Sequence, residues 1–149
     1  MNTLAFRNVD ASPQDPVADW PLEAIQTALE RGGLGDWRQL TRAIQAEPWG
    51  PVARWIEETL IWSRPYGVAM AFERAISHSR DAVEAAEREA VATEIARLVS
   101  ESGLSRTEFA SHIGTSPSRL STYVSGKVTP SAALLLRMRR IAERSQSAL

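Results

Sequence analysis

The chain has 149 residues, with 17 Lys and Arg, 18 Asp and Glu, and no cysteine. This length is sufficient for one domain or for two small ones. The lack of cysteine excludes disulfides and thiolate-bound metals. No run of about 18 apolar residues is present, which excludes a transmembrane helix, and the N-terminus lacks the apolar region of a secretory signal. We therefore expect a cytoplasmic protein.

The N-terminal half is predicted to be helical after a flexible arm. Residues 1–18 contain prolines and acidic residues without any apolar period, as an arm would. Beyond them, apolar residues recur roughly every three to four positions, which predicts helices, and glycine or proline ends each segment. The expected helices run from about Asp19, with Pro21 in the first turn, to Gly32; from a cap at Asp36 to Pro48; from 49 to 63; and from 65 to 78.

All five tryptophans lie in this half of the chain. Trp37 and Trp55 lie on the apolar stripes, which favours a place in the core. Trp20, Trp49 and Trp62 lie near helix ends, and we expect them at a partner or dimer interface, where tryptophan is enriched. An aromatic ligand pocket is an alternative. Residues 19–80 are thus expected to form a dimerisation or partner-binding domain.

A further long helix is expected to begin at Asp81, because Asp81 and Glu84 have the spacing of a capping box. Its first half is acidic and rich in alanine, which favours an exposed connector, whereas a basic partner is the alternative. Its second half carries a thicker apolar stripe and is expected to be the first helix of a C-terminal domain, residues 81–149. No segment alternates apolar and polar residues as a strand does. The fold class is therefore all-α, with a four-helix N-terminal domain joined by a long helix to the C-terminal domain.

Residues 104–131 predict two short helices around a tight turn. Ser105 and Glu108 have capping-box spacing, and Gly114 is a typical helix end. Ser116 followed by Pro117 predicts the start of the second helix, which ends near Ser125. Two capped helices joined by such a turn describe a helix-turn-helix. A last helix is expected from Ser131 to about Arg144, with a frayed tail after it.

This stretch resembles the DNA-binding domain of the lambda-repressor-like (Xre/Cro) family. The resemblance extends over about Val91 to Ala142, and the alternative is a helical hairpin that packs on a partner. The matching residues are Leu104, Ser105, Phe109, Ala110, Ile113, Gly114, Ser116, Pro117, Ser118, Leu120, Gly126, Lys127, Pro130 and Ser131.

The charge distribution agrees with a DNA-binding C-terminal segment. The segment from Asp81 to Gly103 contains six acidic residues and two arginines. The segment from Leu104 to the end contains seven basic and two acidic residues, a local net charge of 7 − 2 = +5. A basic segment of this kind attracts phosphates. An ordinary solvated helix face explains the arginines between Arg137 and Arg144 equally well.

The resemblance implies which residues would meet DNA. In this family the second helix of the motif enters the major groove. The base-reading residues would be Arg106, Pro117, Ser118, Arg119, Ser121 and Thr122. The phosphate contacts would come from Ser105, Ser116, Ser125, Lys127 and Thr129. Arg119 suits guanine, because a guanidinium can bond O6 and N7 together. Pro117 occupies the position where the family often has glutamine or arginine. Because proline cannot donate a hydrogen bond to a base, fewer residues are left for direct readout.

A faint repeat links the two halves. Ile25, Leu29 and Gly33 recur 70 residues later as Ile95, Val99 and Gly103. The N-terminal domain is thus either a degenerate helix-turn-helix copy or a helical domain with similar spacing by chance.

We therefore predict a sequence-specific, double-stranded DNA-binding transcriptional regulator, specifically a repressor, that acts as a homodimer on an inverted repeat. The alternative is the antitoxin of a toxin–antitoxin pair, with the toxin as protein partner of the N-terminal domain. A third reading is a protein-only adaptor. No enzyme, cofactor or metal is predicted, because His78 and His112 are the only histidines and no catalytic or metal-ligand spacing occurs.

Overall fold

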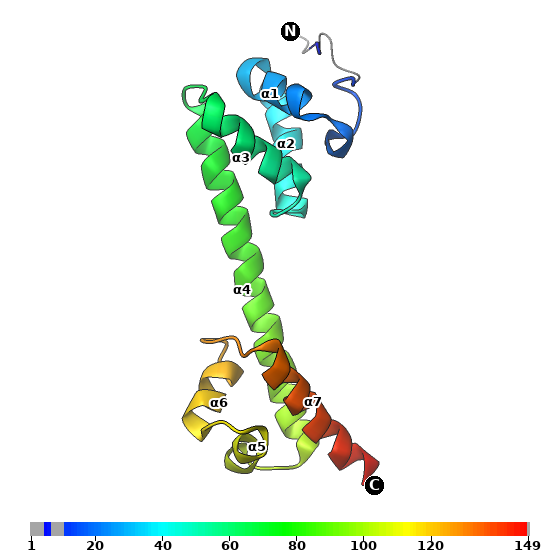
Figure 1. Ribbon diagram of the computed structural model, residues 1–149, viewed down its shortest axis with the longest axis vertical. Coiled ribbons are helices and arrows are strands. Elements are labelled where there is room, and N and C mark those ends of the chain that lie inside the picture. The colour runs from blue at the N-terminus through cyan, green and yellow to red at the C-terminus, as the bar shows by residue number, and fades with distance from the viewer. Residues whose placement is uncertain (1–4, 7–10, 149) are drawn as a thin grey trace. The chain divides into compact units, whose positions relative to one another are not determined.

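In the computed structural model, residues 5–6 and 11–148 are described, and they form helices, turns and irregular segments without a strand (Figure 1). The predicted all-α class is confirmed. The chain divides into two compact units, Met1–Ala82 and Val83–Leu149. No helix in the described part of the chain has the length and apolar character needed to cross a membrane.

The elements follow one another in a simple order. The first unit contains the 3-10 helix η1 (Val17–Asp19), α1 (Leu22–Arg31), α2 (Leu34–Ala46), α3 (Pro51–Trp62) and the beginning of α4 (Val68–Ser102). The second unit contains the rest of α4, α5 (Arg106–Ile113), α6 (Pro117–Val124) and α7 (Ala132–Ser147).

The core of the first unit forms where α3 packs against α1 and α2. Trp20 lies in this core: it is fully buried, and its indole Nε1 donates a hydrogen bond to the carbonyl oxygen of Asp15 at 3.0 Å. Trp20 therefore does not form the exposed interface that we expected, which corrects that expectation. Trp37 and Trp55 pack against the same core, as predicted.

The segment predicted as a flexible arm, residues 1–18, lies partly outside the described residues. Some of its described residues pack within the first unit. Val17 is buried in the core, and the ring of Phe6 meets that of Trp20 edge to face, with 5.0 Å between the centroids.

The helices α1 to α4 all begin at other residues than predicted: α3 begins at Pro51 instead of 49 and α4 at Val68 instead of 65, and the two remaining shifts have a visible cause. The first, α1, begins at Leu22 and not at Asp19, because Trp20 precedes a proline and is held extended at ψ 132°. The second, α2, begins at Leu34, before Asp36. The Asp36 carboxylate still caps this helix, but from inside its first turn, by accepting a hydrogen bond from the N–H of Gly33 at 2.9 Å.

The helix α4 is continuous, although the sequence predicted one helix ending at 78 and another beginning at Asp81. No glycine or proline interrupts residues 68–102, so nothing forces the backbone out of its helical path. Asp81 is an interior residue of α4 and cannot act as a cap, so the predicted capping box with Glu84 is wrong.

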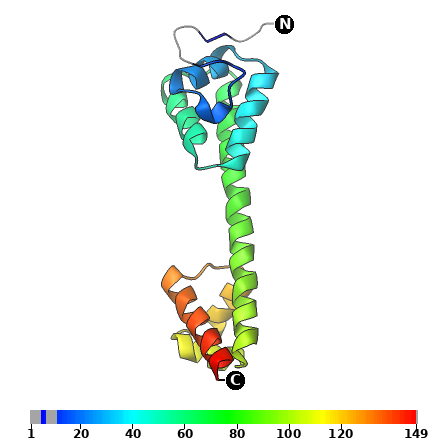
Figure 2. The ribbon, with the colours of Figure 1, turned by 90° about the vertical axis from the view of Figure 1, so that its right-hand side faces the viewer.

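In the second unit α5 packs against α6 and α7 around a core that includes Ile95, Phe109, Leu120 and Met138. The last helix lies along the end of α4 in both ribbon views (Figure 2). It continues to Ser147, beyond the predicted end at Arg144. The Ser145 hydroxyl donates to the carbonyl oxygen of Ser102 at 2.7 Å, which anchors this last turn.

Candidate nucleic-acid interface

Helix α5 begins with a reciprocal cap. The Ser105 hydroxyl accepts a hydrogen bond from the N–H of Glu108 at 3.2 Å, and the Glu108 carboxylate accepts one from the N–H of Ser105 at 2.9 Å. The bond from the Ser105 backbone holds the pKa of Glu108 below its ordinary value. The predicted capping box is therefore present, and it places Arg106 as the first residue of α5.

The turn between the two helices depends on Gly114. This residue adopts φ 80° and ψ 35°, the left-handed conformation in which a side chain would be strained. Its N–H and that of Thr115 both bond to the carbonyl oxygen of Ala110, which closes the end of α5. Only three residues, Gly114 to Ser116, separate α5 from α6.

Helix α6 presents a polar face while it buries an apolar one. Leu120 and Tyr123 are buried in the unit's core, which leaves Ser118, Arg119 and Ser121 exposed on the opposite side. Ser116 caps the helix, since its hydroxyl accepts a hydrogen bond from the N–H of Arg119 at 3.2 Å, and Pro117 occupies the first position, where no N–H is needed.

Two of the predicted base-reading hydroxyls already have partners. The Thr122 hydroxyl donates to the carbonyl oxygen of Arg119 at 2.6 Å, and Thr122 is half-buried. The Ser118 and Ser116 hydroxyl oxygens lie 3.2 Å apart. Arg119 and Arg106, by contrast, have exposed side chains that make no hydrogen bond or ion pair with any described residue.

The loop after α6 folds back on the helix. Gly126 adopts φ 77°, and the N–H of Val128 donates to the carbonyl oxygen of Thr122 at 3.2 Å. This return keeps Lys127 beside the C-terminal end of α6, with its side chain exposed. The remaining residues predicted to contact phosphate are also exposed: Ser105, Ser116, Ser125 and Thr129.

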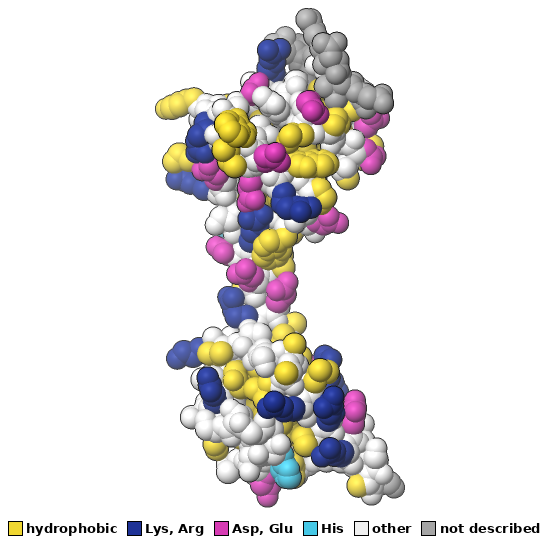
Figure 3. All heavy atoms as spheres, viewed as in Figure 1, with side chains coloured by type: hydrophobic (Ala, Val, Ile, Leu, Met, Phe, Trp, Pro, Cys, Tyr) yellow, Lys and Arg dark blue, Asp and Glu magenta, His cyan; other side chains and the backbone are white. Residues whose placement is uncertain are grey.

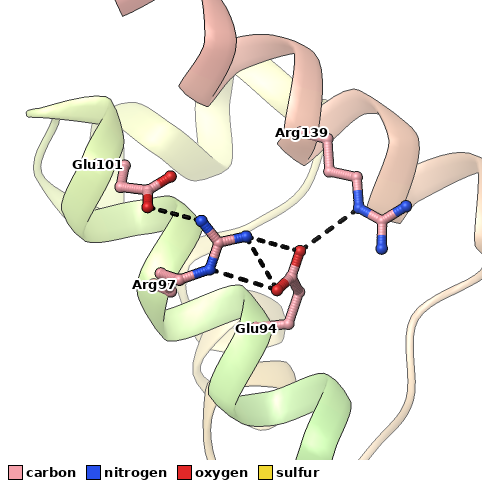
Figure 4. A network of polar contacts seen from close by, with 4 residues as sticks. All are labelled: Glu94, Arg97, Glu101 and Arg139. Atoms are coloured by element: carbon pink, nitrogen blue, oxygen red, sulfur yellow. Dashed lines mark hydrogen bonds and ion pairs between the residues drawn. The ribbon is translucent and has the colours of Figure 1, made fainter. Parts of the chain in front are cut away.

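Among the described residues, some cations of this unit are paired with carboxylates, and others are not. Arg97 forms ion pairs with Glu94 at 2.9 Å and Glu101 at 2.6 Å, and Arg139 of α7 lies 3.4 Å from Glu94 (Figure 4). Their charge is compensated within the fold. Arg106, Arg119 and Lys127 have no carboxylate partner among the described residues, so their charge is available to an external anion. Several Lys and Arg side chains and few carboxylates appear on the face of this unit in Figure 3.

Sequence reasoning missed two supports of this site. Arg137 was counted only as a basic residue, but its guanidinium donates to the carbonyl oxygen of Ile113 at 3.4 Å and so ties α7 to the end of α5. The ion pairs of Arg97 were also missed, although spacings of three and four residues from Glu94 and Glu101 are visible in the sequence.

Comparison with known proteins identifies the fold of this unit. Residues 90–149 match the family model described as a helix-turn-helix domain. The C-terminal part of the chain is therefore a helix-turn-helix domain, a class that binds DNA. No curated protein and no solved structure matches the chain.

Proposed function

We propose that this protein is a sequence-specific DNA-binding transcriptional repressor of the lambda-repressor-like (Xre/Cro) type. The observation that carries the proposal is the state of Arg119. This arginine stands in the first turn of α6, exposed and without a carboxylate partner among the described residues, in a domain that matches the helix-turn-helix model. In helix-turn-helix domains the N-terminal residues of the second helix meet base edges in the major groove.

Arg119 and Arg106 would carry most of the direct readout. Each can donate two parallel hydrogen bonds to guanine. Ser118 and Ser121 would contribute less selective contacts, Pro117 could touch a thymine methyl group, and Thr122 would act mainly as an acceptor because its proton is engaged by Arg119.

The exposed hydroxyls and Lys127 would position the domain on the DNA backbone. Ser105 and Ser116 stand at the N-terminal ends of α5 and α6, where backbone N–H groups and the helix dipole favour phosphate. Ser125, Lys127 and Thr129 extend this contact beyond the end of α6. These contacts add affinity for any sequence.

Two copies of the chain would bind one operator. One α6 has eight residues and therefore reads only a short half-site. A homodimer on an inverted repeat would read two half-sites about 34–36 Å apart, which is one turn of DNA.

Selection from a pool of duplexes with a randomised segment tests the proposed function. The full-length protein is incubated with the pool, and the bound fraction is sequenced. We expect enrichment of a palindrome with two half-sites separated by about one helical turn. Binding without any enriched sequence would contradict sequence-specific regulation.

A role as an antitoxin is the second candidate, and the exposed hydrophobic side chains of the first unit favour a protein contact there. Ile61, Trp62 and Tyr66 are all more than two-thirds exposed, at 71%, 85% and 103%. In that case the first unit would neutralise a toxin while the helix-turn-helix represses the shared operon. Co-expression with the product of the neighbouring gene, followed by size-exclusion chromatography, distinguishes the two roles: a stoichiometric complex that blocks the partner's toxicity supports the antitoxin.

A further inference from the structure

We infer that the first unit carries the dimer interface, and that a second copy of this chain covers an apolar face where α2 meets the α3–α4 corner. This inference rests on the proposed function, because an operator with two half-sites requires two copies. We define the apolar face as a groove between α2 and α4 together with the exposed side chains of Trp62 and Tyr66.

The groove has a volume of about 390 Å³ and is lined by Trp37, Thr41, Tyr66, Val68, Ala71 and Phe72, with Ala75 and Gly67. Its floor is apolar, since Phe72 is buried and Trp37 is half-buried. Its volume lies within the range of about 300–1,000 Å³ that binds organic groups, so it can receive aromatic rings.

Two exposed aromatic residues are close to this groove in the chain: Tyr66 lines it, and Trp62 precedes Tyr66 by four residues. Tyr66 lies in the turn that the backbone N–H of Ala69 closes by bonding to the carbonyl oxygen of Pro65. Arg64 joins the end of α3 to α4, because its guanidinium contacts both the carbonyl oxygen of Leu60 and the carboxylate of Glu73. This tie holds Trp62 beside the same corner. In Figure 3 hydrophobic side chains are exposed at several places on the N-terminal unit, between charged ones.

The area of the apolar face agrees with a dimer interface. Tyr66 is 103% and Trp62 is 85% exposed, and each aromatic side chain buries roughly 150–250 Å² when covered. These two residues therefore supply roughly 300–500 Å², to which the groove and the exposed Leu34, three residues before Trp37 on α2, add, against about 800 Å² per partner in a stable interface. Trp and Tyr are also residue types that are enriched in interfaces.

The shape of the apolar face favours a second copy over an unrelated protein. The apolar face combines the groove with aromatic side chains that project from the surface beside it. A two-fold axis brings the same patch of both copies together, so the aromatic side chains of one copy can cover the groove of the other. Trp49 lies outside this interface. It precedes α3 whereas Trp62 ends it, roughly 18 Å apart along 12 residues of helix, and the guanidinium of Arg80 lies 5.9 Å from its ring.

Sedimentation equilibrium of the full chain and of three variants tests the interface. Tyr66→Glu and Ala71→Glu each place a charge on the apolar face at an exposed position, where folding does not depend on the side chain. Leu136→Glu is the matched control, since Leu136 is 49% exposed and lies in the other unit. We expect a wild-type dimer, a dissociation constant at least about 30-fold higher in both face variants, and no change in the control.

A wild-type chain that stays monomeric up to about 100 μM, or face variants that dimerise as well as wild type, would overturn the inference. So would a monomer that captures a different protein through Tyr66. DNA titrations of the same samples separate this inference from the proposed function. The inference and the proposed function both hold if Tyr66→Glu still binds a single half-site but no longer binds more tightly when a second half-site is present. A dimer sensitive to Tyr66→Glu that selects no DNA sequence would refute the proposed function and leave the interface standing.

Discussion

The hydroxyl oxygen of Ser116 accepts a hydrogen bond from the backbone N–H of Arg119 at 3.2 Å, so the cap of α6 and its principal arginine belong to one turn. The cap fixes the backbone from which the guanidinium projects. The same residue that begins the helix therefore orients the side chain proposed to read guanine.

Removal of this cap should destabilise the second unit. We expect Ser116→Ala to lower the free energy of unfolding by about 1 kcal/mol, within the usual range for N-caps. Ser121→Ala is the control, because Ser121 is exposed on the same helix and its hydroxyl bonds to no described residue. That variant should stay within about 0.5 kcal/mol of wild type. Urea denaturation followed by circular dichroism measures both, and equal values would contradict the capping role.

At Gly114, which has a left-handed backbone, residues that disfavour a positive φ should destabilise the protein. Gly114→Ala should destabilise by about 1–2 kcal/mol, because a Cβ at φ 80° is strained although no atom lies within 4 Å of it. Gly114→Asn should cost less, since asparagine visits this region more readily. Gly35→Ala, at a helical position of α2 with equally open space, should stabilise the protein by about 0.5–1 kcal/mol. Similar effects at both glycines would show that backbone conformation is not the cause.

The carboxylates of the second unit predict a loss of stability in acid. Bonds from Ser105 lower the pKa of Glu108, and the bond from Arg97 lowers the pKa of Glu94, both from an ordinary value of 4.5. A pKa that is lower in the folded state means that the stabilisation is complete above pH 4.5 and is lost as the pH falls through the lowered pKa.

Thermal unfolding at about pH 6 and about pH 3 measures this effect. The unfolding temperature of wild type should fall more between these pH values than that of Glu108→Gln, which keeps an acceptor at the cap but cannot ionise. Glu108 is exposed, so salt should weaken the difference. An identical pH dependence in the two proteins would exclude Glu108 as a contributor.

Lys127 should contribute affinity without selectivity. We expect Lys127→Ala to weaken binding to the selected operator and to random duplex alike, and to reduce the slope of log K against log salt by about one. Arg54→Ala removes the same charge from the exposed surface of the first unit and should leave the slope unchanged. A loss confined to the operator would instead place Lys127 on a base.

Local signals predicted the helix-turn-helix well. Capping serines, Gly114 and Pro117 act within a few residues, and α5 and α6 begin where these residues require. The same reasoning failed at Asp81. A capping pattern starts a new helix only where a glycine or proline ends the preceding one, and none does so before Asp81 within α4. It also failed at Trp20, whose burial results from packing of Phe6 and η1 that no local pattern reveals.

The supports of the site were only partly predictable. The spacing of Glu94, Arg97 and Glu101 is readable from the sequence. The contacts of Arg137 with Ile113 and of Ser145 with Ser102 join residues 24 and 43 positions apart, and they depend on how α7 crosses its neighbours. The structure was needed to find these contacts, and the identity of the base-reading residues stays a prediction.

Fluorescence anisotropy of wild type, Arg119→Ala and Arg54→Ala on the selected operator and on a scrambled duplex tests the central claim most directly. We predict that Arg119→Ala loses about 1–3 kcal/mol on the operator, roughly 5- to 150-fold in affinity, and little on the scrambled duplex. Arg54→Ala should match wild type on both. An Arg119→Ala variant with an unchanged ratio between the two duplexes would contradict the claim that α6 reads the sequence.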